Sequence, residues 1–205
     1  MPKERLSSGE RRQQIIEKAA EIFAAHGLDG ARTRQIAEAC GINEATLYKH
    51  FPSKKALFMA AMTRFHEKTI IGWHKAVEAE PDGLAALRRL VELGLPGLYG
   101  DPEFCTSLLH QLAAAIQDEA AREAVTQWIT RSYDFRRQLI ERGIEDGSLR
   151  PDLDADRYTF LLSGIGWACA VSVALGLGDR FAIERAQRVC EEVMNCMAAT
   201  DEESE

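Results

Sequence analysis

The chain has 205 residues, of which 46% are hydrophobic and 28% are charged, and its formal net charge is −7. A chain of this length buries roughly 70% of its unfolded surface, and this composition is typical of a globular protein rather than a disordered one. Its five cysteines are odd in number and include no C-x-x-C pair, and the first residues lack the apolar segment of a secretory signal. We therefore expect reduced thiols and a cytoplasmic location.

The charge is distributed unevenly along the chain. Residues 1–55 contain ten Lys and Arg against seven Asp and Glu, whereas residues 56–205 contain fifteen against twenty-five. The negative total argues against a nucleic-acid partner, but the cationic segment is the one that a DNA-facing domain on an acidic body would show. A surplus of three charges is weak support when taken alone.

The first predicted helix begins after Ser7 and reaches His26. Ser7 and Glu10 have the spacing of a capping box, in which the side chain of each residue accepts a hydrogen bond from the backbone N–H of the other. Gly27 is expected to end this helix, because glycine adopts the left-handed conformation of a helix terminus without strain.

Residues 33–54 predict two short helices and the start of a third. Thr33 is a candidate cap for the first helix, and Asn43 for the second, which runs to His50. Gly41 lies between them, where a sharp turn requires a left-handed residue. Ser53 is the expected cap of the helix that follows.

Ala37, Gly41 and Leu47 are spaced as a helix-turn-helix requires. A small residue allows close approach of the helices, a glycine forms the turn, and an apolar residue anchors the second helix. At roughly 1.5 Å per residue, the helix over residues 43–50 is about 12 Å long, which matches the width of a DNA major groove. From spacing alone, an ordinary helical hairpin remains an alternative.

The segment TLYKHFPSKKALF, and residues 8–60 as a whole, resemble the DNA-binding domain of the TetR family of transcriptional regulators. This resemblance implies that the first turn of the second helix faces base edges. The residues of that turn are Asn43, Glu44, Ala45 and Thr46. It also implies contacts to, or support of, the phosphate backbone from Thr33, Tyr48, His50 and Lys54. Contacts to either bases or phosphates are expected from Arg34 and Lys49.

Glu44 departs from what a DNA-facing surface favours, because its carboxylate is repelled by phosphates. Two interpretations stay open. The carboxylate accepts a hydrogen bond from a cytosine amino group, or it only stabilises the positive end of the helix dipole.

The rest of the chain is also predicted to be helical. It lacks the alternation of apolar and polar residues and the hairpin turns that indicate β-strands. A long helix from Ser53 to about Glu78 is expected to link the two parts of the protein, with a break at residues 81–83. The helices that follow are predicted at about residues 84–98, 103–117 and 119–146.

Residues 158–178 form an uncharged stretch of 21 residues, which is long enough to cross a membrane. Acidic residues flank both ends, no Lys/Arg cluster sets an orientation, and Gly, Ser and Ala are abundant. We therefore expect no membrane partner, and a helix buried within a soluble assembly instead.

The last predicted helix has apolar residues at heptad spacing, namely Ile183, Ala186, Cys190, Val193 and Met197. Together with the uncharged helix, it gives each chain two helices that need partners. A twofold dimer that joins them as a four-helix bundle would satisfy both. The TetR resemblance implies the same homodimer through the last two helices.

The resemblance further implies a small-molecule effector pocket in the C-terminal region, which we expect to be apolar and to take a lipophilic effector. The candidate lining residues are Phe104, His110, Trp128, Tyr133 and Trp167. Each of them also fits an ordinary core position.

The function expected from these features is that of a ligand-responsive regulator, most simply a repressor, that binds palindromic double-stranded DNA as a homodimer. We expect an all-α fold, with a DNA-binding domain over residues 1–55 and a helical effector-binding and dimerisation domain over residues 56–205. No catalytic motif, metal-ligand spacing or cofactor signature is present. The alternatives are a redox- or metal-sensing helical regulator, with Cys40 as an oxidisable thiol if exposed, and a helical enzyme that does not bind DNA.

Overall fold

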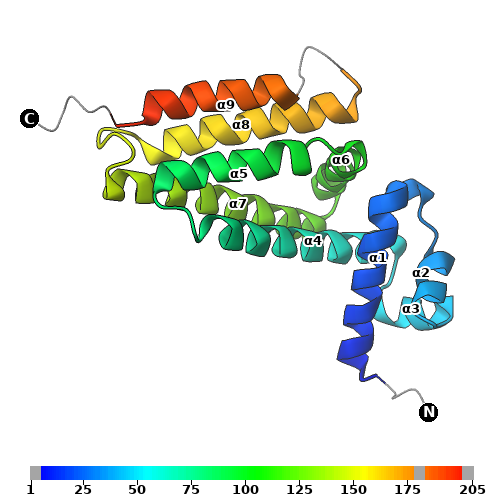
Figure 1. Cartoon of the computed structure of the whole chain (residues 1–205). Coiled ribbons are helices and arrows are strands. Elements are labelled where there is room, and N and C mark those ends of the chain that lie inside the picture. The colour runs from blue at the N-terminus through cyan, green and yellow to red at the C-terminus, as the bar shows by residue number, and fades with distance from the viewer. Residues whose placement is uncertain (1–5, 178–182, 200–205) are drawn as a thin grey trace, which may run out of the picture. The chain divides into compact units, whose positions relative to one another are not determined.

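The computed structural model describes residues 6–177 and 183–199, and within them the fold is all-α (Figure 1). The only β-type pairing in these ranges is an isolated antiparallel bridge between Leu149 and Ala198. The helices are α1 (Ser8–Gly30), α2 (Thr33–Ala39), α3 (Glu44–His50), α4 (Lys54–Val77), α5 (Gly83–Gly97), α6 (Pro102–Gln117), α7 (Glu119–Asp146), α8 (Ala155–Ala174) and α9 (Ile183–Met197). The expected fold class is therefore confirmed.

The chain divides into two compact units. The first unit comprises residues 1–68 and 110–125, and the second comprises residues 69–109 and 126–205. Helices α4, α6 and α7 each contribute residues to both units. The functional division after residue 55 remains a prediction.

The first unit is built around aromatic and aliphatic side chains of α1 to α4. Ile15, Phe23, Ile36 and Leu47 have no exposed surface, and neither has Phe58. The rings of Phe23 and Phe58 meet edge to face with centroids 5.1 Å apart, which joins α1 to α4. This core holds the two short helices α2 and α3 in place.

Helix termini in the first unit follow the predicted caps with two corrections. The capping box at Ser7, the Asn43 cap of α3 and the Ser53 bond to the N–H of Ala56 are confirmed. Thr33 does not cap α2: the N-cap is Arg32, whose N–H donates to the side chain of Gln35. The predicted end at Gly27 is a kink, with φ of 64°, after which the helix continues to Gly30.

In the second unit, α9 lies beside both α5 and α8 (Figure 1). Buried residues of α4, α5, α7, α8 and α9 form one core. Ala186, Cys190 and Met197 of the predicted heptad seam belong to this core. These residues therefore pack within their own chain rather than against a partner chain. A dimer through the last two helices, which remains a prediction, would therefore have to use other surfaces of α8 and α9.

No helix within the described ranges is long and apolar enough to cross a membrane. Helix α8 contains most of the uncharged stretch but begins at Ala155, so Asp156 and Arg157 lie in its first turn. The end of the stretch, Gly178, lies outside the described residues.

Candidate DNA-binding surface and ligand cavities

The turn between α2 and α3 has the geometry that the spacing of residues predicted. Gly41 has φ of 65°, in the left-handed region where a Cβ is strained. Ala37 is 1% exposed and Leu47 is fully buried, so the two helices meet closely on their inner faces. Helix α1 braces the turn, since Nη1 of Arg11 donates to the carbonyl oxygen of Cys40 over 3.2 Å.

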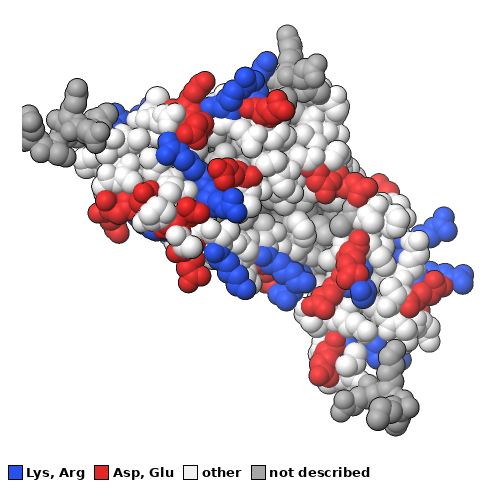
Figure 2. Space-filling model, viewed as in Figure 1, with Lys and Arg blue, Asp and Glu red and all other residues white. Residues whose placement is uncertain are grey.

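The predicted DNA-contacting residues lie on the outer faces of α2 and α3, at the N-cap of α3 and at the start of α4. None of the ten is buried, and the Tyr48 side chain, next to fully buried Leu47, is 46% exposed. Figure 2 shows Lys and Arg side chains together with Asp and Glu over this part of the chain, so the surface is mixed rather than purely basic. These positions are accessible to a partner, and their role in DNA binding remains a prediction.

Five of the ten residues are joined by hydrogen bonds: the Thr46 hydroxyl donates to Oδ1 of Asn43 over 2.9 Å, and the other three form a separate cluster. The hydroxyl of Thr33 donates to Oε1 of Glu44 over 2.7 Å, and the hydroxyl of Tyr48 lies 3.4 Å from the hydroxyl oxygen of Thr33. Glu44 therefore has a structural role that neither sequence interpretation included, which is to tie the start of α3 to the start of α2. This cluster positions two hydroxyl groups on the exposed surface.

The other basic candidates differ in how they are held. Arg34 pairs with Glu38 through a 2.8 Å contact on the exposed face of α2. Lys54 donates from Nζ to the carbonyl oxygen of Asp29 over 3.3 Å. A neutral oxygen holds the Lys54 side chain without neutralising its charge, which suits it for a phosphate contact.

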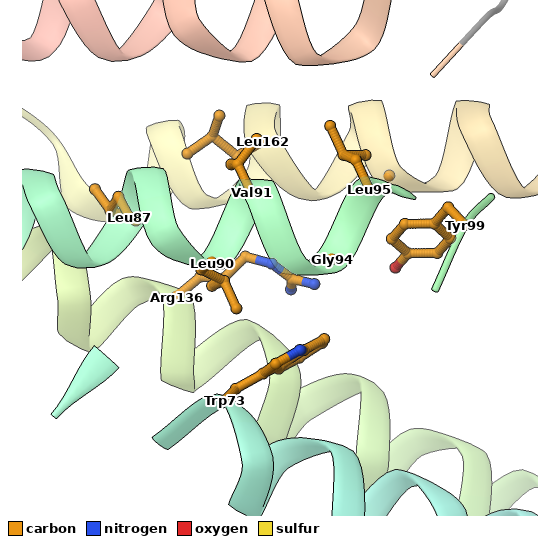
Figure 3. A pocket seen from close by; sticks show the side chains of 10 residues that line it. Trp73, Leu87, Leu90, Val91, Gly94, Leu95, Tyr99, Arg136 and Leu162 are labelled. Atoms are coloured by element: carbon orange, nitrogen blue, oxygen red, sulfur yellow. The ribbon is translucent and has the colours of Figure 1, made fainter. Parts of the chain in front are cut away.

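Tyr99 and Arg136 both line two neighbouring cavities of the second unit. The first has a volume of about 40 Å³ and the second about 30 Å³. Besides the shared pair, the first is lined by Trp73, Leu87, Leu90, Val91, Gly94, Leu95, Leu162 and Gly166 (Figure 3). The second is lined by Trp128, Ile129, Ser132, Tyr133, Ser163 and Trp167.

The guanidinium group of Arg136 is surrounded by neutral groups. Its Nη1 lies 2.9 Å from the carbonyl oxygen of Ser132 and 3.4 Å from the hydroxyl of Ser163. Its Cζ lies 5.7 Å from the centroid of the Trp73 ring. Burial lowers the pKa of Arg136, partly offset by the nearby Tyr99 phenol, and an arginine nonetheless stays protonated at neutral pH.

The five candidate effector contacts separate into two groups. Trp128, Tyr133 and Trp167 line the second cavity, where the two indole rings are 6.0 Å apart. Phe104 does not line either cavity and packs against the ring of Tyr99 instead. His110 belongs to the first unit, with Nε2 4.0 Å from a carboxylate oxygen of Asp29. The ligand-binding role of all five stays a prediction.

Arg136, Tyr99 and Ser163 were missed by the sequence analysis. A signal was present for Arg136, because it lies on the same face of α7 as buried Ser132 and Ile140, at helical spacing. A charged residue on an otherwise buried face indicates a special environment.

The thiols and acidic groups give little support to redox or metal sensing. Cys40 is 4% exposed, and burial raises the pKa of its thiol, which reduces the thiolate available for oxidation. In the portion of the chain that the structure covers, no three His, Cys, Asp or Glu side chains are grouped so that they could hold a metal ion.

Comparison with known proteins agrees with this arrangement. Residues 15–61 match the model of the bacterial regulatory proteins of the tetR family, and residues 105–190 match a tetracyclin repressor-like C-terminal domain. The HTH-type transcriptional repressor KstR2 of Rhodococcus jostii is 29% identical over 164 residues, covering 77% of this chain and 76% of the repressor.

Solved structures share the whole fold. A putative transcriptional regulator from Saccharomonospora viridis, solved in complex with choline, has a TM-score of 0.77 at 26% identity and covers 92% of this chain and 97% of its own. FadR from Bacillus subtilis, solved in complex with stearoyl-CoA, has a TM-score of 0.68 at 17% identity, covering 89% and 97%. With a matching DNA-binding domain, a matching C-terminal domain and a shared fold, this chain is a member of the TetR family of transcriptional regulators.

Proposed function

We propose that this ligand-responsive regulator binds a palindromic operator as a homodimer in the cytoplasm and releases it when a small lipophilic effector enters the second unit. The observation that carries the proposal is the division of α3 into a buried face, anchored by Leu47, and an exposed face with hydroxyl and basic groups. A short helix presented in this way fits the major groove.

On the DNA side, we assign direct base contacts to the first turn of α3 and phosphate contacts to the residues around it. The Thr33–Tyr48 pair offers hydroxyl groups at the surface, and Lys54 and Lys49 offer ammonium groups. Phosphate contacts fix the register of the helix, and base contacts determine the sequence that is read. We expect a repressor, because blocking a promoter needs no contact beyond the operator itself.

The homodimer is supported by an uncharged stripe on the exposed side of α8. Phe160 is 74% exposed, Leu175 63% and Val171 39%, and Gly164 and Ala168 lie between them at helical spacing. Figure 2 shows an area without charged side chains over the end of α8. An apolar stripe with small residues in the middle permits close approach of a second α8 about a twofold axis.

The effector function is supported by the two cavities and by α4. Trp73 of α4 lines the first cavity, and the same helix begins at Lys54, beside α3 in the sequence. The first cavity, at about 40 Å³, holds only a few water molecules, so a lipophilic effector must move its walls apart. Displacement of α4 would then change the spacing of the two α3 helices and release the operator.

Selection of bound fragments from a random duplex pool tests the DNA-binding proposal. We expect enrichment of a pseudo-palindrome whose half-sites are about one helical turn apart, roughly 34–36 Å. Lys49→Glu on α3 should abolish the enrichment, whereas Lys75→Glu, an exposed lysine of α4 in the second unit, should preserve it. A pool without any enriched sequence would contradict the proposal.

Substitution of two glycines tests the dimer. At both positions, a side chain would not clash with other atoms of the same chain. A Cβ at Gly164 of α8, or at Gly72 of α4, would meet no atom within 4 Å. Gly164→Leu should therefore convert the dimer to a monomer in sedimentation equilibrium, and Gly72→Leu should not. A dimer that persists in Gly164→Leu would exclude this face as the interface.

A further inference from the structure

Arg136 is the point where the two cavities of the second unit meet. It lines both, together with Tyr99, and Figure 3 shows its side chain lying among apolar residues of the first cavity. Its neighbours are a backbone carbonyl, the Ser163 hydroxyl, the Tyr99 phenol and the Trp73 ring. No carboxylate within the described ranges forms an ion pair with it, whereas Arg137, the next residue, pairs with Glu141 over 3.1 Å.

A positive charge in such a place is unfavourable for stability alone. Arg136 is partly buried as a residue, and even partial burial of a guanidinium is normally compensated by a carboxylate, because neutral oxygens and aromatic rings replace only part of its hydration. The groups that act electrostatically on Arg136 are Tyr99 and Cys190, neither of which is anionic at neutral pH. The charge is therefore available to a group that enters from outside the chain.

We propose that the effector of this regulator is an apolar carboxylate whose carboxyl group binds Arg136 and whose hydrocarbon part occupies the first cavity. This inference rests on the proposed function and specifies its ligand class. A planar guanidinium binds a carboxylate through two parallel hydrogen bonds, and the adjacent Ser163 and Tyr99 hydroxyls supply further donors.

The hydrocarbon and carboxylate ends of such a ligand correspond to different parts of the two cavities. The first cavity presents leucine side chains, namely Leu87, Leu90, Leu95 and Leu162, around the Trp73 ring. The second cavity is lined by Ser132 and Ser163 in addition to the side chains of Trp128 and Trp167. An amphiphilic anion would place its apolar body in the former and its carboxylate at the junction. A cationic amphiphile would meet Arg136 with like charge, which disfavours it.

The chain contains the means of detecting this ligand. It has three tryptophans, Trp73, Trp128 and Trp167, and every one of them lines one of the two cavities. Intrinsic tryptophan fluorescence of the full-length protein therefore reports on ligand entry without a label. The probes are octanoate, 1-octanol and octylammonium, which have the same chain length and differ in charge, each used below its aggregation concentration.

We expect octanoate to bind the unmodified protein at least about tenfold more tightly than 1-octanol, with octylammonium weakest. Arg136→Met should reduce the ratio of the octanoate and 1-octanol affinities to about one while leaving 1-octanol binding intact. Arg137→Met, which removes a surface guanidinium one residue away, should preserve the ratio. Ser163→Ala should weaken octanoate about two- to fivefold and leave 1-octanol unchanged.

Equal affinities of the three probes for the unmodified protein, or a preference for octylammonium, would overturn the inference. So would an Arg136→Met variant that keeps the preference for octanoate. Should Arg136→Met fail to give a folded protein by circular dichroism, the three-probe comparison and Ser163→Ala still decide the matter, because neither depends on that variant.

Operator release, measured by fluorescence anisotropy of a labelled duplex from the selection, separates this inference from the proposed function. If a neutral or cationic compound releases the operator and octanoate does not bind, the regulator function stands and the carboxylate site is wrong. If octanoate binds through Arg136 but no duplex is recognised at all, the carboxylate site stands and the proposed function is wrong.

Discussion

The two units bury their apolar residues for different purposes. In the first unit, recognition residues lie outside the core: Leu47 is fully buried, and its neighbours Tyr48 and Lys49 are exposed on the other side of α3. In the second unit, Leu90 and Leu162 belong to the core and also line the first cavity. Stability and DNA recognition can therefore be changed independently, whereas stability and effector binding cannot.

The largest expected effect comes from removing the same side-chain atoms from the cores of the two units, which tests whether the units differ in this way. Leu57 of α4 is fully buried in the first unit and borders neither cavity, while Leu90 is 5% exposed and lines one. Leu57→Ala should lower the free energy of unfolding by about 3–5 kcal/mol and Leu90→Ala by about 2–3 kcal/mol, because Leu90 borders open space and loses fewer packing contacts. Denaturant unfolding followed by circular dichroism measures both. A larger loss at Leu90 would contradict the comparison.

A second prediction concerns the buried histidine of the first unit. Burial lowers the pKa of His66 to about 4, although its Nε2 lies 3.2 Å from Oε1 of Gln111 on α6. Because the unfolded chain binds this proton more readily, stability is retained above pH 6.5 and falls as the pH decreases towards 4. The loss amounts to about 3 kcal/mol at roughly 1.4 kcal/mol per pKa unit. His66→Gln should flatten the stability curve between these pH values, and an unchanged slope would exclude His66 as its cause.

Backbone conformation, rather than packing, is tested by two glycines of comparable surroundings. Gly41 and Gly72 both face open space, but only Gly41 has a positive φ, of 65°. Gly41→Ala should destabilise by about 1–2 kcal/mol, because a Cβ strains the left-handed turn. Gly72→Ala should stabilise by about 0.5–1 kcal/mol, because alanine favours a helix interior. Thermal melting should shift in opposite directions, and a shift of the same sign would refute the turn argument.

The smallest effect on stability is expected on the recognition surface. Lys54→Ala removes one ammonium group held by the carbonyl oxygen of Asp29, and should change the free energy of unfolding by less than about 0.5 kcal/mol. Its effect should appear in DNA binding, where the slope of log affinity against log salt falls by about one. Lys75→Ala is the control, and equal slopes in all three proteins would remove Lys54 from the phosphate contacts.

The contrast between the units also explains what the sequence could predict. The helix-turn-helix was predictable because its requirements are local: Asn43 caps, Gly41 turns and Leu47 anchors, all within a few residues. Among the predicted N-terminal caps, Thr33 was wrong: Arg32 and Gln35 satisfy the start of α2, and the Thr33 hydroxyl bonds to Glu44 instead. Several side chains near a helix start can form hydrogen bonds of similar strength. The sequence pattern does not show which of these hydrogen bonds will form.

The cavities were less predictable, because their lining is assembled from four helices and a loop that are distant in the sequence. An apolar residue at helical spacing is expected to be buried whether or not a cavity lies beside it, so Trp128 and Trp167 could not be distinguished from Phe104 by pattern. The α9 seam shows the same ambiguity, since its periodicity was correct but its partner was the chain itself. Arg136 carried a signal that the sequence analysis missed, because it is a charged residue on a largely buried face of α7.

The absence of a side chain at Gly166 of α8 sets the width of the first cavity, so a substitution at this position would change that width. A methyl group at this position would lie 3.1 Å from the ring of Tyr99, tighter than ordinary van der Waals contact, on the side of α8 away from Gly164. Glycine and alanine codons differ by a single base, so one nucleotide change is enough to narrow the space beside Arg136. A regulator built in this way can acquire a new inducer range through point mutation while its operator, read by a separate set of residues, stays the same.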